Sequence, residues 1–190
     1  STLASIAFPA WHLGRNPGHE FISCSYSGSL AMNFSRKVRQ MLREPNYKNV
    51  FEKTNLDKDS QSVESWQTTK GGGYVAAGVG GGITGKGAHV LLIDDPVKNR
   101  EDAESENNRE STWDWYTSTA YTRLAPGGGI LIILTRWHDD DLAGKLLTAS
   151  EKGADEWEVV KYPAIAEEDE EFRKTGEPLH PERYNVESLG

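Results

Sequence analysis

Apolar and polar residues follow two recurring patterns along the chain, and these patterns predict an order of strands and helices. Short β-prone or fully apolar runs occur at 21–24, 90–93 and 130–134. Such runs are typical of strands that are buried on both faces of a parallel sheet. Helical patterns follow them, with apolar residues spaced three and four apart from Leu30 to Leu42 and a polar, Glu-rich stretch over 99–123. The resulting order of strand, helix, strand, helix and strand indicates βαβ units around a parallel sheet.

Weaker patterns complete the expected order. The segments 62–68 and 74–79 are separated by a glycine-rich turn, which predicts a hairpin. The polar segment 46–60 is expected to be a loop. A further helix is expected through residue 148 with Asp139 or Asp140 as its N-cap, and residues 158–162 are expected to form a last strand.

Composition narrows the class of protein. Of the 190 residues, 36% are hydrophobic and 26% charged, which is typical of a soluble globular domain. No apolar run approaches the roughly 20 residues that span a bilayer, so we expect no membrane partner. The net charge of -8 argues against a uniformly basic surface for nucleic acid but leaves room for a local basic face. Residues 1–162 are therefore assigned to a folded core, and the acidic, irregular remainder 163–190 to a linker.

Two aspartates follow the apolar run at 90–93. Four apolar residues followed by Asp94 and Asp95 form the Walker B arrangement, in which the strand carries the first carboxylate to the magnesium of a bound nucleotide. The second carboxylate can polarise the attacking water. Taken alone, the same residues also fit an ordinary core strand that ends in solvated aspartates.

Thr135 and Arg136 follow the apolar run at 130–134 in the same way. Because parallel strands place their carboxyl ends at one edge of a sheet, Thr135 is expected within a few ångströms of the two aspartates. Threonine can hydrogen-bond a γ-phosphate or its attacking water, and arginine can stabilise phosphoryl charge. The alternative for Thr135 is that it only caps the next helix. His138 with the three following aspartates also suggests a metal cluster, but adjacent side chains cannot all point at one ion, so these aspartates are interpreted as helix-start residues.

The glycine-rich segment 80–87 contains two phosphate-cradle patterns, G-x-G-x-x-G and G-x-x-x-x-G-K. Both patterns require a helix directly afterwards, whose N-terminus would bind phosphate. A strand is predicted there instead, and Gly87 stands where a magnesium-binding hydroxyl would be needed. The favoured interpretation is a mobile loop between two strands, with a nucleotide cradle as the alternative.

Taken together, these motifs resemble the ATPase domain of the phage terminase large subunit, the motor that packages DNA into capsids. Ser1 and Thr2 look like the end of a Walker A motif, and residues 91–96 with Lys98 are similar to the family's Walker B region. Residues 134–142, with the sequence LTRWHDDDL, form the most specific match and look like the family's coupling motif. The resemblance implies an α/β fold of the P-loop NTPase type (ASCE class), with a mostly parallel sheet flanked by helices.

The resemblance also implies a mechanism and its participants. ATP would be the nucleotide, with Ser1, Thr2 and Asp94 binding it and Mg²⁺ held by Ser1 and Asp94. Asp95, Thr135 and Arg136 would be the catalytic group. Double-stranded DNA, the terminase small subunit and the portal protein would be partners of a homo-oligomeric ring in the host cytoplasm.

Three departures from the family pattern qualify these expectations. The Walker A glycines and lysine lie outside this sequence, so the chain by itself is expected to hydrolyse ATP weakly or not at all. Asp95 is one methylene shorter than the glutamate that is common in P-loop motors. A counterpart of the family's C-terminal nuclease domain is not expected within these residues.

Three arginines are candidates for contact with DNA. Arg36, Arg39 and Arg43 fall at three- and four-residue spacing on one helix face, where they could meet phosphates. The alternative is an ordinary solvated charged face.

Two other functions also remain open. A helicase-type P-loop ATPase shares the Walker B strand but leaves the LTRWHDDDL segment unexplained, and an inactive prophage remnant would act only as a binding module.

Overall fold

A computed structural model describes residues 1–83 and 85–189 of the chain. The chain divides into two compact units, Ser1–Thr148 and Ala149–Gly190. The first unit contains a six-stranded sheet with the strand order β2-β3-β4-β1-β5-β6. Its strands are β1 (Glu20–Ser25), β2 (Leu56–Gln61), β3 (Ser65–Thr68), β4 (Gly73–Gly78), β5 (Ala88–Asp94) and β6 (Leu124–Ile133).

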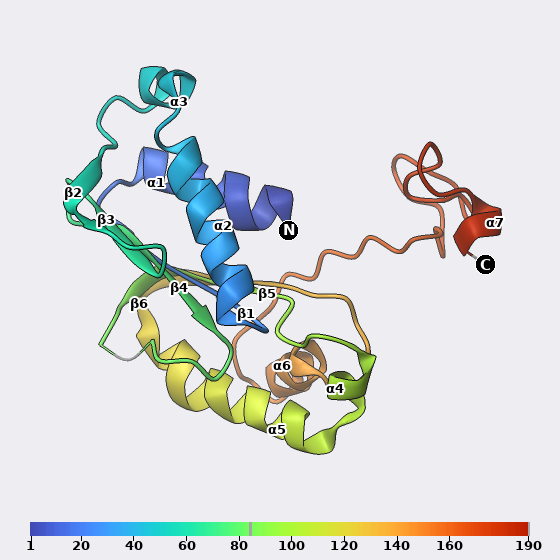
Figure 1. The fold of residues 1–190 in the computed structure, drawn as a ribbon. Helices are drawn as coiled ribbons and strands as arrows, with labels where there is room; N and C mark the ends of the chain where they lie inside the picture. The colour runs from blue at the N-terminus through green and yellow to red at the C-terminus, as the bar shows by residue number, and fades with distance from the viewer. Residues whose placement is uncertain (84, 190) are drawn as a thin grey trace. The chain divides into compact units, whose positions relative to one another are not determined.

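The sheet is parallel through β4, β1, β5 and β6, whereas β2, β3 and β4 are connected as antiparallel neighbours. Helices α1 (Phe8–Arg15) and α2 (Gly28–Met41) lie on one side of it, and α4 (Arg100–Glu104) and α5 (Glu106–Trp115) on the other (Figure 1). Two further helices of this unit are α3 (Pro45–Val50) and α6 (Leu142–Glu151), the last of which runs into the second unit. The predicted α/β fold, with a mostly parallel sheet flanked by helices, is confirmed.

The core lies between the sheet and helices α1 and α2. Phe21, Tyr74 and Trp66 come from three neighbouring strands, and their rings stack in a row with centroids 5.5 and 5.2 Å apart. The Trp66 indole donates a hydrogen bond of 2.9 Å to the hydroxyl of Ser35 on α2, so its polar edge is satisfied inside the core. Strands β1 and β5 are buried almost throughout, as their apolar sequences predict. This packing fixes the carboxyl ends of β1 and β5 relative to the first helices.

Four sequence-based expectations about local structure are wrong. The segment 46–60 is not a loop throughout, because it contains α3 and β2, and the polar strand β2 forms through backbone pairing with β3. β6 begins at Leu124 rather than 130 and stays half-exposed, because it is the last strand of the described sheet. Residues 158–162 are irregular, since a β-prone run becomes a strand only when another strand pairs with it. The fourth concerns the N-cap of α6, which neither Asp139 nor Asp140 provides.

The second unit is largely irregular. It contains the short helix α7 (Val186–Leu189) and one isolated bridge between Ile165 and Pro178. Within its acidic run, Asp169 accepts hydrogen bonds from Lys174 (2.8 Å) and from the backbone and hydroxyl of Thr175. These contacts close a turn, and they help to hold the pKa of Asp169 below its usual value, with Lys174 as the largest cause. The predicted boundary between residues 162 and 163 stays a prediction. Across the described parts of both units, no helix has the length and apolar character needed to cross a membrane.

Candidate active site

The two strands that carry the candidate residues are adjacent and parallel, as predicted. β5 pairs with β6, with Asp94 opposite Ile133, and the backbone N–H of Asp95 donates a hydrogen bond of 2.8 Å to the carbonyl of Ile133. Both strands therefore deliver the residues that follow them to the same edge of the sheet. In α/β sheets this edge, beyond the carboxyl ends of the strands, is where ligands bind.

Asp94 ends β5, and its residue is only 1% exposed. Its Oδ2 accepts a hydrogen bond of 2.5 Å from the hydroxyl of Ser5. Its Oδ1 is buried and has no hydrogen-bond partner among the described residues. A buried carboxylate oxygen without a partner is rare in folded proteins and calls for an explanation. A hard divalent cation such as Mg²⁺ prefers oxygen ligands of this kind, so the Asp94 carboxylate fits a magnesium ligand.

Asp95 adopts an unusual backbone conformation, with a φ of +47°. This left-handed region costs most residues about 1–2 kcal/mol, although aspartate tolerates it better than most because its short polar side chain can bond locally. Its carboxylate accepts a hydrogen bond from the backbone N–H of Thr135. The turn at Asp95 therefore connects the end of β5 to the segment that follows β6.

The pKa of Asp95 lies above the usual aspartate value. Burial is the largest cause, and the negative charge of Asp94 adds to it. The Thr135 N–H opposes the shift. A carboxylate with a raised pKa is a stronger base, which suits a residue that polarises water.

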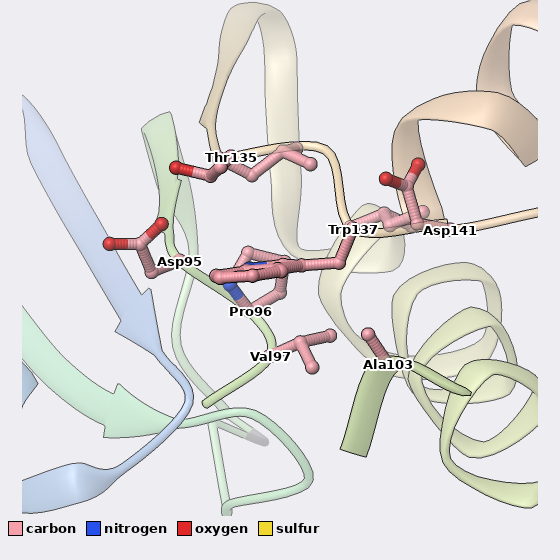
Figure 2. Close-up of a pocket in the computed structure, with 9 residues that line it drawn as sticks. Asp95, Pro96, Val97, Ala103, Thr135, Trp137 and Asp141 are labelled. Atoms are coloured by element: carbon pink, nitrogen blue, oxygen red, sulfur yellow. The ribbon is translucent and has the colours of Figure 1, made fainter. Parts of the chain in front are cut away.

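A narrow pocket lies beside these residues. Figure 2 shows Asp95 and Thr135 at one end, Asp141 at the other, and the Trp137 side chain extending across to Pro96. The cavity has a volume of about 10 Å³, which is enough for about one water molecule. The Trp137 residue is 47% exposed, so it covers the pocket while remaining in contact with solvent.

Arg136 binds Asp141. Its Nε atom lies 2.6 Å from Oδ2 of Asp141, and the two form an ion pair.

The N-cap of α6 differs from the predicted Asp139 or Asp140. Asp141 caps α6, because its Oδ1 accepts a hydrogen bond of 2.9 Å from the backbone N–H of Gly144. The alternative that Thr135 caps this helix is therefore wrong.

Asp140 faces a different direction and pairs with Arg109 at 3.3 Å and Lys145 at 3.2 Å. The carboxylates of Asp140 and Asp141 thus have separate partners. Among the described residues, no group of three or more acidic, histidine or cysteine side chains could hold a metal ion. The interpretation of these aspartates as helix-start residues is favoured over a metal cluster.

The sequence only partly predicts which N-terminal residue contacts the site. Ser1 and Thr2 are exposed, and residues Thr2–Ala7 form a π-helical turn. Within the described parts of the chain, the side chain that hydrogen-bonds Asp94 is Ser5. Sequence reasoning missed Ser5, although its position four residues after Ser1 places it about one helical turn further on the same side.

Arg36 and Arg39 lie on α2 and Arg43 lies just beyond its end, but Arg39 and Arg43 also bind the end of β2. Arg39 donates to the carbonyls of Gln61 and Ser62, and Arg43 donates to the side-chain oxygen of Gln61. Burial, and then the charges of Arg43 and Arg36, lower the pKa of Arg39. Arg36 is exposed. The cluster is therefore a positive surface that also helps to hold the edge strand.

The glycine-rich segment 80–87 is followed by β5 and not by a helix. Gly80 and Gly85 have φ values of +78° and +76°, as tight turns require. Thr84, within this segment, lies outside the described residues. The absence of a following helix favours a loop over a phosphate cradle.

Comparison with known proteins agrees with the resemblance found in the sequence. The family described as terminase large subunit, T4likevirus-type, N-terminal, matches residues 1–189. Among solved structures, the crystal structure of the HK97 bacteriophage large terminase is similar at 15% sequence identity and a TM-score of 0.46, over 72% of this chain and 26% of that chain. No curated protein matches the chain. Because the family match covers nearly all of the sequence, the chain belongs to the terminase large subunit family, in the part that forms its N-terminal region.

Proposed function

We propose that this chain is the ATP-hydrolysing part of a terminase large subunit, which drives double-stranded DNA into a phage procapsid. Terminase large subunits are ATPases in general, and the family membership supports a role in DNA packaging. The observation that carries the proposal is the shared edge of β5 and β6, where Asp94, Asp95 and Thr135 meet and Asp94 keeps an unpaired buried oxygen. Family membership also favours this function over a helicase-type ATPase.

Mg²⁺ and the phosphates of ATP would bind at this edge. The unpaired Oδ1 of Asp94 would be the protein's magnesium ligand, with the hydroxyl of Ser1 as a second ligand and Thr2 close to the phosphates. Bound Mg²⁺ would neutralise phosphate charge as the bond to the leaving group breaks. Residues before Ser1 in the full-length protein would supply the Walker A glycines and lysine.

Asp95 would orient the attacking water and accept its proton, which its raised pKa favours. Thr135 is held next to Asp95 through its backbone N–H, so its hydroxyl could contact the γ-phosphate or the water. Arg136 could stabilise phosphoryl charge once it leaves Asp141.

The DNA and protein partners belong to the same proposal. Arg36, Arg39 and Arg43 would contact DNA phosphates, and the assembled motor would be a homo-oligomeric ring that binds the small subunit and the portal protein in the host cytoplasm. The clustering of the three positive charges supports the DNA contact. The acidic net charge of the whole chain means that such a contact would be confined to this face.

The proposal can be tested with the full-length protein. We expect Mg²⁺-dependent ATP hydrolysis that double-stranded DNA stimulates, and we expect Asp94→Asn to abolish it because an amide is a poor ligand for a hard cation. Asp59→Asn, an exposed change on β2, is the matched control and should leave hydrolysis unchanged. Hydrolysis that survives Asp94→Asn, or a full-length protein that binds no nucleotide, would overturn the proposal.

A further inference from the structure

The loop between β6 and α6 is closed by the side chain of Arg136. Its Nε pairs with Oδ2 of Asp141 at 2.6 Å, and its Nη2 donates to the carbonyls of Asp139 at 3.0 Å and His138 at 3.4 Å. The guanidinium thus uses several of its donors within the five residues that follow it.

The two partners of this ion pair differ in burial. The Arg136 side chain is 44% exposed, whereas the Asp141 side chain is 6% exposed. An exposed guanidinium can leave for another anion without a large change in its own solvation. The buried Asp141 carboxylate would then lose its counter-ion, and leaving a buried charge unpaired is costly. The free-energy cost of releasing Arg136 would therefore arise mainly at Asp141.

Asp141 connects this ion pair to α6. Its second oxygen, Oδ1, accepts the N–H of Gly144 and caps the helix. A side chain at position 144 would come within 1.8 Å of the Asp139 carbonyl, so the loop and the first helical turn are packed without spare room. One carboxylate consequently holds both Arg136 and the start of α6.

The neighbouring contacts fix the two sides of the loop. Asp140 pairs with Arg109 and with Lys145, and Lys145 also binds Glu110 at 2.7 Å, which ties the start of α6 to α5. At the other side, the backbone of Thr135 is bound to the Asp95 carboxylate. Arg136 lies between these two anchored points. It is the more exposed of the two residues in its ion pair.

We propose that Asp141 is a positioning residue that holds Arg136 in a resting position, and that Arg136 exchanges Asp141 for a nucleotide phosphate when ATP binds. This inference rests on the proposed function and concerns the regulation of the same site. The exchange leaves Asp141 without its counter-ion while it still caps α6, so the nucleotide state is passed to that helix. Asp140 keeps the helix on α5 throughout.

Asp141→Asn separates these two tasks of Asp141. Asparagine caps helices about as well as aspartate, so the helix start is retained while the ion pair is lost. Asp140→Asn is the matched control, because it removes a neighbouring carboxylate and leaves the Arg136–Asp141 pair in place. Binding of the non-hydrolysable analogue AMP-PNP and of ADP, each with Mg²⁺, would be measured for the full-length protein.

We expect Asp141→Asn to bind AMP-PNP about three- to tenfold more tightly than the wild type, because a competing partner of Arg136 has been removed. ADP affinity and the Asp140→Asn control should change much less. Arg136→Ala in the Asp141→Asn background should abolish the gain, which a merely structural role of Asp141 would not predict. Trp137, directly after Arg136, should report the exchange as an AMP-PNP-dependent fluorescence change that is absent in Trp137→Phe.

Equal AMP-PNP affinity in wild type and Asp141→Asn would overturn the exchange, as would a gain that persists without Arg136. If Asp141→Asn fails to fold, Arg136→Ala alone tests the inference, because it should weaken the binding of AMP-PNP more than the binding of ADP. An unchanged ratio of AMP-PNP affinity to ADP affinity in Arg136→Ala would contradict the inference. A wild-type protein that binds and hydrolyses ATP while these tests fail would leave the proposed function standing, whereas absence of any nucleotide binding would overturn both.

Discussion

Ser5 and Asp94, which are 89 residues apart in the sequence, are joined by a buried hydrogen bond of 2.5 Å between the Ser5 hydroxyl and Oδ2 of the carboxylate. This bond ties the first turns of the chain to the end of the strand that carries the candidate magnesium ligand. It also orients the carboxylate, so that Oδ1 remains the oxygen without a partner. The position of Asp94 is therefore set from two directions, by β5 and by the N-terminal segment.

Ser5→Ala should lower the free energy of unfolding by about 1.5–3 kcal/mol, because a hydrogen bond to a buried charged group is lost and its acceptor stays unpaired. Chemical denaturation of the 190-residue chain, followed by tryptophan fluorescence, measures this change. Ser111→Ala, at an exposed position of α5, is the control and should change stability by less than about 0.5 kcal/mol. Equal effects of the two substitutions would show that the Ser5 contact contributes little.

Asp95→Asn in the full-length protein should preserve ATP binding and slow hydrolysis by about 10²–10⁴-fold, the usual contribution of a positioned general base. The pH profile provides a second readout. Since only the deprotonated carboxylate accepts a proton, the wild-type rate should fall as the pH decreases through the raised pKa of Asp95. This fall in rate at low pH should disappear in Asp95→Asn. If the fall persists in the variant, a group other than Asp95 causes it.

Thr135→Ala should leave ATP affinity nearly unchanged and impair hydrolysis or DNA packaging. Alanine retains the backbone N–H that binds the Asp95 carboxylate, so the substitution removes only the hydroxyl. Thr117→Ala, whose hydroxyl bonds helical carbonyls away from the site, serves as the control. Normal hydrolysis and packaging by Thr135→Ala would leave the hydroxyl without a functional role.

Acid should destabilise the chain through His12 and His19, which lie in a cluster with His89. His12 Nε2 lies 3.1 Å from His19 Nδ1, the rings of His19 and His89 stack at 4.2 Å, and the N–H of Glu20 donates to His89 Nδ1. Burial, followed by the charges of the neighbouring histidines, lowers the pKa of both His12 and His19.

The direction of the pH effect follows from these lowered values. Below the ordinary histidine pKa of about 6.5 the unfolded chain binds protons that His12 and His19 resist in the folded chain, so stability should fall as the pH decreases. Urea unfolding at neutral pH and at about pH 5.5 measures the difference. His12→Gln should reduce this pH dependence, and His180→Gln, exposed in the second unit, should not.

Arg36→Ala should weaken binding of double-stranded DNA by the full-length protein and reduce the salt dependence of binding by about one phosphate contact. The exposed Arg36 side chain can be removed without disturbing the contacts that Arg39 and Arg43 make with Gln61. Arg15→Ala, at the end of α1 where Arg15 lies over the Trp11 ring, is the charge-matched control. Equal salt dependence in wild type and Arg36→Ala would exclude Arg36 from the DNA interface.

Much of the sheet edge that forms the candidate site could be predicted, because apolar runs identify buried strands and parallel strands place their ends together. The pairing of Asp94 with Ile133 and the contact of Thr135 with Asp95 follow directly from that rule. The strand β2 could not be found in this way, since its sequence LDKDSQ is polar and its pairing depends on backbone groups.

Two other features depend on contacts that no local pattern contains. Asp139, Asp140 and Asp141 have the same intrinsic capping preference, and the choice among them is made by partners elsewhere. Arg109 and Lys145 hold Asp140, which leaves Asp141 to cap α6. Similarly, the role of Ser5 becomes visible only when the N-terminal turn and β5 are brought together.

The left-handed turn at Asp95 also restricts how this protein can evolve. One nucleotide change converts an aspartate codon into a glutamate codon, so mutation regularly offers the longer carboxylate at this position. A glutamate would have to adopt the same positive φ without the short side chain that makes aspartate tolerable there. Lineages that keep this turn should therefore retain aspartate, and a switch to glutamate should be accompanied by changes that reshape the backbone between β5 and α4.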